Sequence, residues 1–172
     1  MARQVSVIGS GHEHESAAEE VGRLLAERGC IVVTGGLDEV MAAAHRGAKK
    51  AGGTTLAILP GESRAEANPW ADHVVVTGVG HARNLAVAAS GDAVIAVGGS
   101  WGTLAEIAFA MRLGRPVVVL DGYSYLPAAR ADLLRRLDRH AEAAASYREA
   151  LALTDNAPER RFLERRLRDV GG

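Results

Sequence analysis

Cysteine is almost absent from this sequence, which contains only Cys30 among its 172 residues. A single cysteine excludes an internal disulfide framework and a zinc site built from cysteine ligands. Cys30 begins the apolar run at residues 30–33, where a free thiol is expected to pack as a small buried side chain.

The sequence also lacks an excess of charge and any long hydrophobic run. The formal net charge is −1, so bulk electrostatics give no reason to expect binding to nucleic acid or to an anionic membrane. The N-terminus leads directly into a short strand-like run, without a signal-peptide core or a segment long enough to span a membrane. We therefore expect a cytoplasmic protein with neither nucleic acid nor membrane as a partner.

Short apolar runs alternate with amphipathic segments over most of the chain. The strand-like runs are residues 5–8, 31–34, 54–59, 74–77, 93–97 and 117–120, and the helix-like segments are residues 13–28, 38–51, 82–89 and 103–113. Strands this apolar, alternating with amphipathic helices, predict a parallel sheet covered by helices on both faces. We therefore predict an α/β, Rossmann-like domain over residues 1–122.

The end of the chain has a different character, because no strand-like run follows residue 120. A stripe at helical spacing contains Leu126, Leu133, Leu134 and Leu137. Asp155 and Asn156 are candidate caps of a later helix. We predict a helical tail over residues 123–172 that packs on the Rossmann-like domain or on a partner subunit.

Glycine-containing turns follow three of the predicted strands, and they are Gly9-Ser10-Gly11, Gly35-Gly36 and residues 98–102. In parallel α/β sheets, ligands bind in the crevice beyond the carboxyl ends of the strands. Glycine allows the backbone to turn sharply and to approach a ligand closely. The sequence therefore predicts a site for a phosphorylated, nucleotide-type small molecule, with Gly9, Ser10, Gly35 and Gly36 among the binding residues.

The third glycine turn leads into a helix predicted to begin near Thr103. Such a helix directs unpaired N–H groups and its positive dipole end at the turn, which suits a phosphate. Glu106 lies about one helical turn further on, so its carboxylate can face the same crevice. The predicted cradle consists of Gly98, Gly99, Ser100, Trp101, Gly102 and Thr103. The alternatives are an ordinary strand-to-helix turn and, for Glu106, an acid that only complements the helix dipole.

Arg83 and Asn84 begin another predicted helix at the same edge of the sheet. Arg83 can pair with a phosphate or with Glu106, and Asn84 can bond to a sugar or a base. The alternatives are a solvated arginine and an asparagine that caps a helix. The histidines at residues 12 and 14 lack the spacing of a helical pair of metal ligands, so we predict no metal site.

Together these motifs resemble the lonely guy (LOG) and lysine-decarboxylase-like family of Rossmann proteins, over residues 5–120. That family carries an arginine at a helix start, matched by Arg83, and a Pro-Gly-Gly-x-Gly-Thr-x-x-Glu motif, matched by residues 98–106. Gly98 replaces the proline, Ser100 replaces a glycine, and Asn84 stands where lysine is usual. These variations resemble the small-protein branch of the family, which includes molybdenum cofactor carrier proteins.

The resemblance implies hydrolysis of the N-glycosidic bond of a nucleoside 5′-monophosphate, which releases the base and ribose 5-phosphate. It implies that Glu106 stabilises the oxocarbenium-like centre or positions water, that Arg83 holds phosphate or ribose, and that residues 99–103 cradle the phosphate. No resident cofactor is predicted.

The second glycine turn departs from that family, because Gly35-Gly36 is followed by Leu37-Asp38-Glu39 rather than by more glycines. Two carboxylates at a helix start complement the dipole themselves and repel an anionic ligand. Either this turn contacts a base, or the usual ligand does not bind.

The tail is similar to the tetratricopeptide-like helical end of some extracytoplasmic-function sigma factors, at residues 125–137, 150–156 and 159–163. It contains no DNA-reading element.

Three functions remain open: a hydrolase, a non-catalytic carrier of molybdenum cofactor or another nucleotide-like ligand, and a scaffold with a decayed site. We favour nucleotide binding with hydrolysis as an accompanying activity. We expect a homodimer or larger homo-oligomer, because the leucine stripes of the tail need a partner surface.

Overall fold

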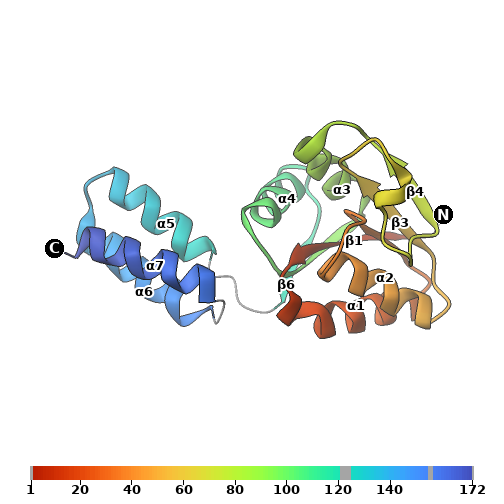
Figure 1. Ribbon diagram of the computed structural model, residues 1–172, viewed down its shortest axis with the longest axis horizontal. Coiled ribbons are helices and arrows are strands. Elements are labelled where there is room, and N and C mark those ends of the chain that lie inside the picture. Colours follow the sequence, from red (N-terminus) through yellow and green to blue (C-terminus); the bar gives the residue numbers. More distant parts are fainter. Residues whose placement is uncertain (1, 121–124, 155–156, 172) are drawn as a thin grey trace. The chain divides into compact units, whose positions relative to one another are not determined.

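The computed structural model describes residues 2–120, 125–154 and 157–171. Asp155 and Asn156, the candidate helix caps, lie outside the described residues, as does the side chain of Leu126. The chain divides into two compact units, Met1–Asp121 and Gly122–Gly172. Figure 1 colours the larger unit from red to green and the smaller one in blue tones.

The larger unit is built on a six-stranded sheet, in which all neighbouring described strands are parallel (Figure 1). The strand order is β4-β3-β2-β1-β5-β6. The strands are β1 (Gln4–Ser10), β2 (Ile31–Thr34), β3 (Thr55–Leu59), β4 (His73–Val76), β5 (Ala93–Gly98) and β6 (Val117–Leu120). The predicted α/β, Rossmann-like sheet is thereby confirmed.

The central strands are apolar because both of their faces are covered. Val7 of β1, Val32 of β2 and Val97 of β5 are fully buried and belong to one core cluster. Continuous buried runs of this kind are typical of parallel strands. The edge strands differ, since Val75 of β4 and Val118 of β6 are about half exposed.

Helices cover both faces of this sheet (Figure 1). Those on one face are α1 (Glu15–Glu27) and α2 (Val40–Lys50), and those on the other are α3 (Arg83–Ser90) and α4 (Trp101–Arg112). A β-carbon on Gly22 of α1 would lie 1.9 Å from the carbonyl oxygen of Ala44 in α2. Glycine therefore lets α1 and α2 approach closely. Short 3-10 turns complete the connections: η1 (His12–His14), η2 (Arg64–Glu66) and η3 (Gly80–Ala82).

Each of these four helices begins one or two residues from where the sequence predicts, and α4 and α2 show the physical reason. α4 begins at Trp101, before Thr103, because Ser100 and Thr103 form a capping box. In it, the amide of Ser100 donates to Oγ1 of Thr103 over 3.1 Å. α2 begins at Val40 rather than at residue 38, because Glu39 has a φ of 55° and so lies outside the helical region.

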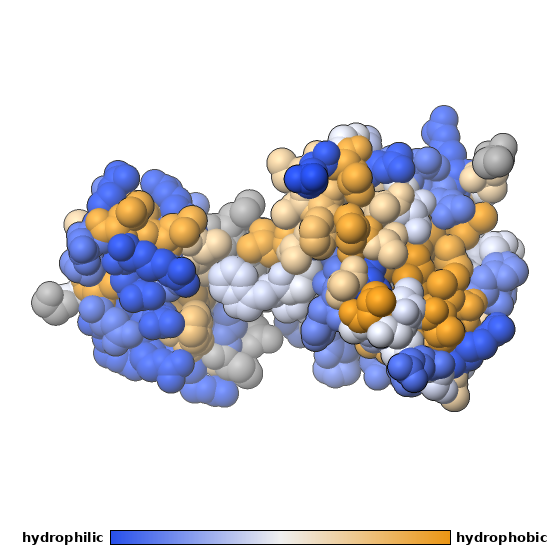
Figure 2. Space-filling model, turned by 90° about the horizontal axis from the view of Figure 1, so that it is seen from above, coloured by the Kyte–Doolittle hydropathy of each residue, from blue (hydrophilic) through white to orange (hydrophobic). Residues whose placement is uncertain are grey.

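The smaller unit consists of α5 (Tyr125–Arg136), α6 (His140–Ala152) and α7 (Ala157–Val170), with α6 packed against both other helices. It has its own core, in which Tyr147 and Leu163 are buried. The predicted leucine stripe is only partly buried: Leu134 lies in the core, but Leu133 and Leu137 are exposed because they face away from α6 and α7. Most of this unit's surface in Figure 2 is hydrophilic. No helix in the described residues is long and apolar enough to cross a membrane.

Candidate functional site

The three predicted glycine turns lie at one edge of the sheet. They follow β1, β2 and β5, which are neighbours in the order β2-β1-β5. After β1 the chain continues to β2 on one side, whereas after β5 it continues to β6 on the other. A crevice beyond such a reversal of strand order is the usual ligand site of open parallel sheets.

Gly9 and Gly98 are required where other parts of the protein come close. Gly9 pairs with Val97 of β5, and a β-carbon on Gly9 would lie 2.0 Å from the carbonyl oxygen of Val97. A β-carbon on Gly98 would lie 2.0 Å from the ring of His14. Both glycines also have a positive φ, which other residues rarely adopt. Their role in this structure is close packing of protein atoms, and direct contact with a ligand stays a prediction.

The turn between β5 and α4 is the predicted phosphate cradle. The capping box uses the backbone amides of Ser100 and Thr103, so two donors of the helix start already have protein partners. A β-carbon on Gly99 would lie 2.7 Å from Cβ of Thr103. Gly102 has more room, since the nearest atoms to a β-carbon there are Nδ2 of Asn84 at 3.6 Å and Oγ of Ser100 at 3.7 Å. Gly102 is therefore the glycine of this turn that best allows a ligand to approach.

Arg83, at the start of α3, is buried rather than solvated. Its side chain is 9% exposed, and a β-carbon on Gly35 would lie 1.8 Å from Nη1 of Arg83. The guanidinium therefore lies against the second glycine turn. Nε and Nη1 have no hydrogen-bond partner in the described part of the chain. Burial lowers the pKa of Arg83, partly opposed by Glu106, but an arginine stays protonated in proteins. Buried donors without partners are rare in proteins and are expected where a ligand supplies an acceptor.

Glu106 of α4 lies beside Arg83, as the sequence predicts. Its Oε1 is 3.9 Å from Nη1 of Arg83, and its side chain is 9% exposed. This distance is too long for a hydrogen bond. Burial raises the pKa of Glu106 to about 7, and the attraction of Arg83 opposes the rise only in part. The carboxyl group is therefore partly protonated at neutral pH and can donate as well as accept a hydrogen bond.

Asn84 connects the starts of α3 and α4. Its Nδ2 lies 3.5 Å from the carbonyl oxygen of Gly102, while its Oδ1 is buried without a partner in the described residues. Trp101, at the start of α4, is 55% exposed. An unmet acceptor on Asn84 and unmet donors on Arg83 thus lie on consecutive residues at this edge of the sheet.

A buried network supports the second glycine turn, and sequence reasoning missed it. The amide of Gly36 donates to Oγ1 of Thr34, which lies 3.1 Å from Nε2 of His45. Nδ1 of His45 lies 3.3 Å from Oδ1 of Asn68, and Nδ2 of Asn68 donates to the carbonyl oxygen of Gly36. Burial lowers the pKa of His45 to about 4, so this histidine is neutral at physiological pH. The sequence feature that could have indicated a buried histidine is the position of His45 in the alanine-rich helical segment 40–50.

The two acids that follow this turn have different surroundings. Asp38 is exposed, whereas Oε2 of Glu39 accepts a hydrogen bond of 2.5 Å from the amide of Gly11 in the first glycine turn. Oε1 of Glu39 lies 3.6 Å from Nε2 of His12. The backbone of Glu39, with φ 55° and ψ −128°, is in a region that costs a non-glycine residue about 1–3 kcal/mol.

His12, near the first turn, contacts two neighbouring acids, Glu15 and Glu39. His12 hydrogen-bonds to Glu15 over 2.8 Å, and this bond, together with the charge of Glu39, raises the pKa of His12. No group of three His, Cys, Asp or Glu side chains that could hold a metal ion occurs in the described residues.

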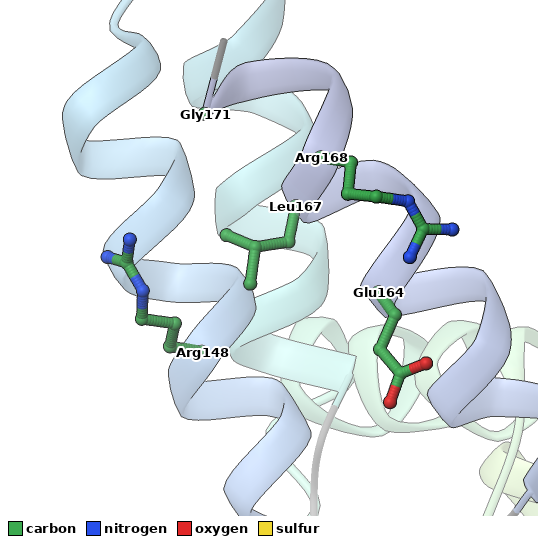
Figure 3. A pocket seen from close by; sticks show the side chains of 5 residues that line it. All are labelled: Arg148, Glu164, Leu167, Arg168 and Gly171. Carbon is green, nitrogen blue, oxygen red and sulfur yellow. The ribbon is translucent and has the colours of Figure 1, made fainter.

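A depression of about 400 Å³ lies on the smaller unit (Figure 3), lined by Arg148, Glu164, Leu167, Arg168 and Gly171. Leu167 projects toward α6, whereas the guanidinium of Arg168 points away from it. None of its lining side chains carries a buried polar atom without a partner, and none belongs to a glycine turn. We therefore place the candidate site on the larger unit.

Comparisons with known proteins place the chain in a family. The model of the family described as LDcluster4, SLOG cluster4 family, matches residues 2–153. An uncharacterized protein of Archaeoglobus fulgidus is 43% identical in an alignment of 128 residues, which covers 69% of this chain and 84% of that protein.

Among solved structures, the molybdenum cofactor binding protein of Rippkaea orientalis is 36% identical with a TM-score of 0.71, over 77% of this chain and 85% of that one. The Moco carrier protein of Chlamydomonas reinhardtii is 33% identical with a TM-score of 0.64, over 88% of this chain and 99% of that one. DNA processing protein A of Streptococcus pneumoniae is 25% identical with a TM-score of 0.61, over 71% of this chain and 51% of that one. The chain therefore belongs to the SLOG cluster4 family.

Proposed function

We propose that this protein is a carrier that binds a phosphorylated, nucleotide-like ligand, of the class of the molybdenum cofactor, without changing it chemically. The observation that carries the proposal is the buried guanidinium of Arg83 with unmet donors, at the sheet edge where α4 begins. A buried donor without a partner is costly, and a phosphate oxygen would satisfy it. Relatives described as binding or carrying the molybdenum cofactor support the same class of ligand.

The neighbouring residues fit a ligand that has both a phosphate and a heterocycle. The unmet Oδ1 of Asn84 is an acceptor and suits an N–H of a pterin or a base. The open side of Gly102 allows close approach to the start of α4, where the helix dipole favours an anion. A carrier requires no more than this cradle, and carrier function therefore replaces hydrolysis as the principal proposal.

Calorimetric titration with isolated molybdenum cofactor and with AMP tests the proposal. We expect at least one of the two to bind, and binding to be lost in Gly102→Val. If neither ligand binds to the folded wild-type protein, the carrier proposal is wrong. DNA is a necessary third probe because of the similarity to DNA processing protein A. That nucleic acid is not a partner stays a prediction. The cytoplasmic location and the resemblance of the tail to sigma factors also stay predictions.

A second candidate is the LOG-like hydrolysis of a nucleoside 5′-monophosphate. The observation that favours it is the carboxyl of Glu106, whose pKa of about 7 suits proton transfer at neutral pH. Release of ribose 5-phosphate from AMP, measured beside binding, separates the two candidates. Turnover that disappears in Glu106→Gln while binding survives would establish the hydrolase, and binding without turnover leaves the carrier.

A further inference from the structure

The first glycine turn already holds an anionic group, and this group belongs to the protein. The carboxylate of Glu39 accepts a short hydrogen bond from the amide of Gly11, as a phosphate oxygen does at a glycine-rich turn. Gly11 lies between β1 and the start of η1 and α1, where Rossmann-like sheets commonly bind phosphate. We propose that Glu39 competes with the ligand's phosphate for this turn and must leave Gly11 before an anionic ligand binds there. The inference rests on the proposed function, whose site it regulates.

The backbone at Glu39 has a conformation that suits glycine better than glutamate. Its φ of 55° lies in a region that glycine adopts readily and other residues rarely. A glycine at this position would keep the turn and remove the carboxylate. The side chain of Glu39 is 33% exposed, so it can move into solvent without disturbing the core.

The charges around the turn also oppose an incoming anion. A β-carbon on Gly11 would lie 2.9 Å from Oε1 of Glu13, so a second carboxylate lies close by. The cation nearest to Glu39 is His12 when protonated, at 3.6 Å, and His12 is itself hydrogen-bonded to Glu15. A phosphate at Gly11 would therefore experience like-charge repulsion, weakened by salt because the turn is partly exposed.

An internal competitor has a clear consequence for a carrier. Because Glu39 is part of the same chain, its carboxylate returns to Gly11 as soon as a phosphate leaves, and it thus opposes rebinding. The competition lowers the affinity for the cargo and favours its net release, which is what delivery of a cargo requires.

Three variants test the inference. Glu39→Gly removes the carboxylate and the backbone strain, whereas Glu39→Gln removes the charge alone. Asp38→Asn is the matched control, because Asp38 is an exposed neighbouring acid. The probes are inorganic phosphate and AMP, titrated at low and at high ionic strength. The signals are the dissociation constant and the NMR shift of the Gly11 amide, which reports occupation of the turn directly. Circular dichroism verifies that each variant is folded.

We expect Glu39→Gly and Glu39→Gln to bind AMP about tenfold more tightly at low salt, with a smaller gain at high salt. The Gly11 amide should respond to phosphate in both variants, and Asp38→Asn should behave as the wild type does. A gain in Glu39→Gly alone would assign the effect to backbone strain and overturn the competition. Weaker binding in both variants would make Glu39 a ligand contact and also overturn it.

The two proposals fail in different ways. If all variants bind AMP and molybdenum cofactor as the wild type does, the competition is wrong while the carrier function stands. If inorganic phosphate reaches Gly11 in Glu39→Gly but neither AMP nor cofactor binds to any variant, the carrier function is wrong while the competition stands.

Discussion

Arg83 and Glu106 face each other across 3.9 Å in a region from which water is largely excluded. Neither group is well solvated, and the distance does not allow a hydrogen bond. Attraction between two such charges recovers desolvation energy only when the geometry is good and the remaining donors are satisfied. In the ligand-free protein the pair is therefore a source of instability, which a bound anion would relieve.

Replacement of Arg83 by methionine tests this reading. We expect Arg83→Met to lower the free energy of unfolding of the ligand-free protein by about 3 kcal/mol, because it leaves Glu106 buried without its opposite charge. AMP binding should weaken about a hundredfold. Urea unfolding and calorimetric titration measure the two effects, with Arg112→Met at the exposed end of α4 as the control. A folded Arg83→Met variant that still binds AMP normally would contradict the assignment of Arg83.

The raised pKa of Glu106 predicts a stability that declines as pH rises. Between its ordinary value of 4.5 and about 7, the folded protein holds a proton on Glu106 that the unfolded chain has released. The unfolding free energy should therefore fall by up to about 3 kcal/mol across this range. His45 acts oppositely, because its folded pKa of about 4 lies below the ordinary 6.5, so that stability is lost as pH falls between these values.

Comparison of Glu106→Gln with the wild type isolates the first effect. The variant lacks the contribution of Glu106, so the difference in unfolding free energy, variant minus wild type, should increase with pH from 4.5 to 7. Urea titrations across this range measure it. Parallel curves for the two proteins would show that Glu106 has an ordinary pKa.

At the level of single elements, the start of α4 has backbone amides that are already hydrogen-bonded and, at Gly102, space in which a ligand can approach. Ser100 and Thr103 hydrogen-bond to each other in the capping box, whereas the nearest side-chain atom to a β-carbon on Gly102 is Nδ2 of Asn84, at 3.6 Å. The capping box fixes where the helix begins, and Gly102 determines how close a ligand can come to it.

Gly102→Val should therefore fold normally and lose ligand binding. Valine is the better helix former, so stability should be unchanged or slightly higher, while its branched side chain would project toward the ligand. Gly99→Ala is the informative contrast: with φ 140° and 2.7 Å to Cβ of Thr103, it should destabilise the fold by about 1–3 kcal/mol. Thermal unfolding and AMP titration separate these effects. Unchanged affinity in folded Gly102→Val would remove this turn from the site.

The elements differ in how far they could be predicted from the sequence. Apolar runs bounded by glycine identify the six strands, because strands buried on both faces leave a local signal. The helix starts depend on capping contacts and on the conformation of single residues, such as the positive φ of Glu39. The predicted starts therefore lie one or two residues from the observed ones.

Site contacts depend on pairing of distant strands, which a local pattern does not encode. The sequence predicted that Arg83 pairs with a phosphate or with Glu106, because Arg83 begins one helix and Glu106 lies one turn inside another helix at the same edge of the sheet. The contact of Glu39 with Gly11 and the support of His45 by Asn68 come from loops brought together only by the tertiary fold. The sequence indicated that the acidic turn matters, but not which of its acids reaches the other turn.

For the whole molecule, the expected self-association stays a prediction, and the surface suggests where to test it. Figure 2 shows apolar residues gathered on a face of the larger unit. Leu85 of α3 and Met111 of α4 are exposed, on 44% and 68% of their surface, and these two helices pack together. Exposed apolar side chains on adjacent helices are candidates for an interface between copies.

We expect the wild type to be at least dimeric and the double variant Leu85→Lys, Met111→Lys to be monomeric, because buried lysines would disrupt an apolar interface. Light scattering coupled to size-exclusion chromatography measures the mass. Leu133→Lys on the smaller unit is the control, and dissociation in this control alone would move the interface to the tail. A monomeric wild type would refute self-association.

The central position of β1 has a consequence for the order of folding. Gln4 of β1 pairs with Ile31 of β2, whereas Val5 pairs with Ala93 of β5, much further along the chain. Contacts between distant segments close large loops and form later than local ones. The units β1-α1-β2 and β2-α2-β3 can therefore assemble while one edge of β1 is still open, and an open apolar strand edge invites pairing with another chain. Until β5 covers that edge, the chain presents an apolar strand edge to other chains, and the turn at residues 98–102 does not yet lie beside the other two glycine turns.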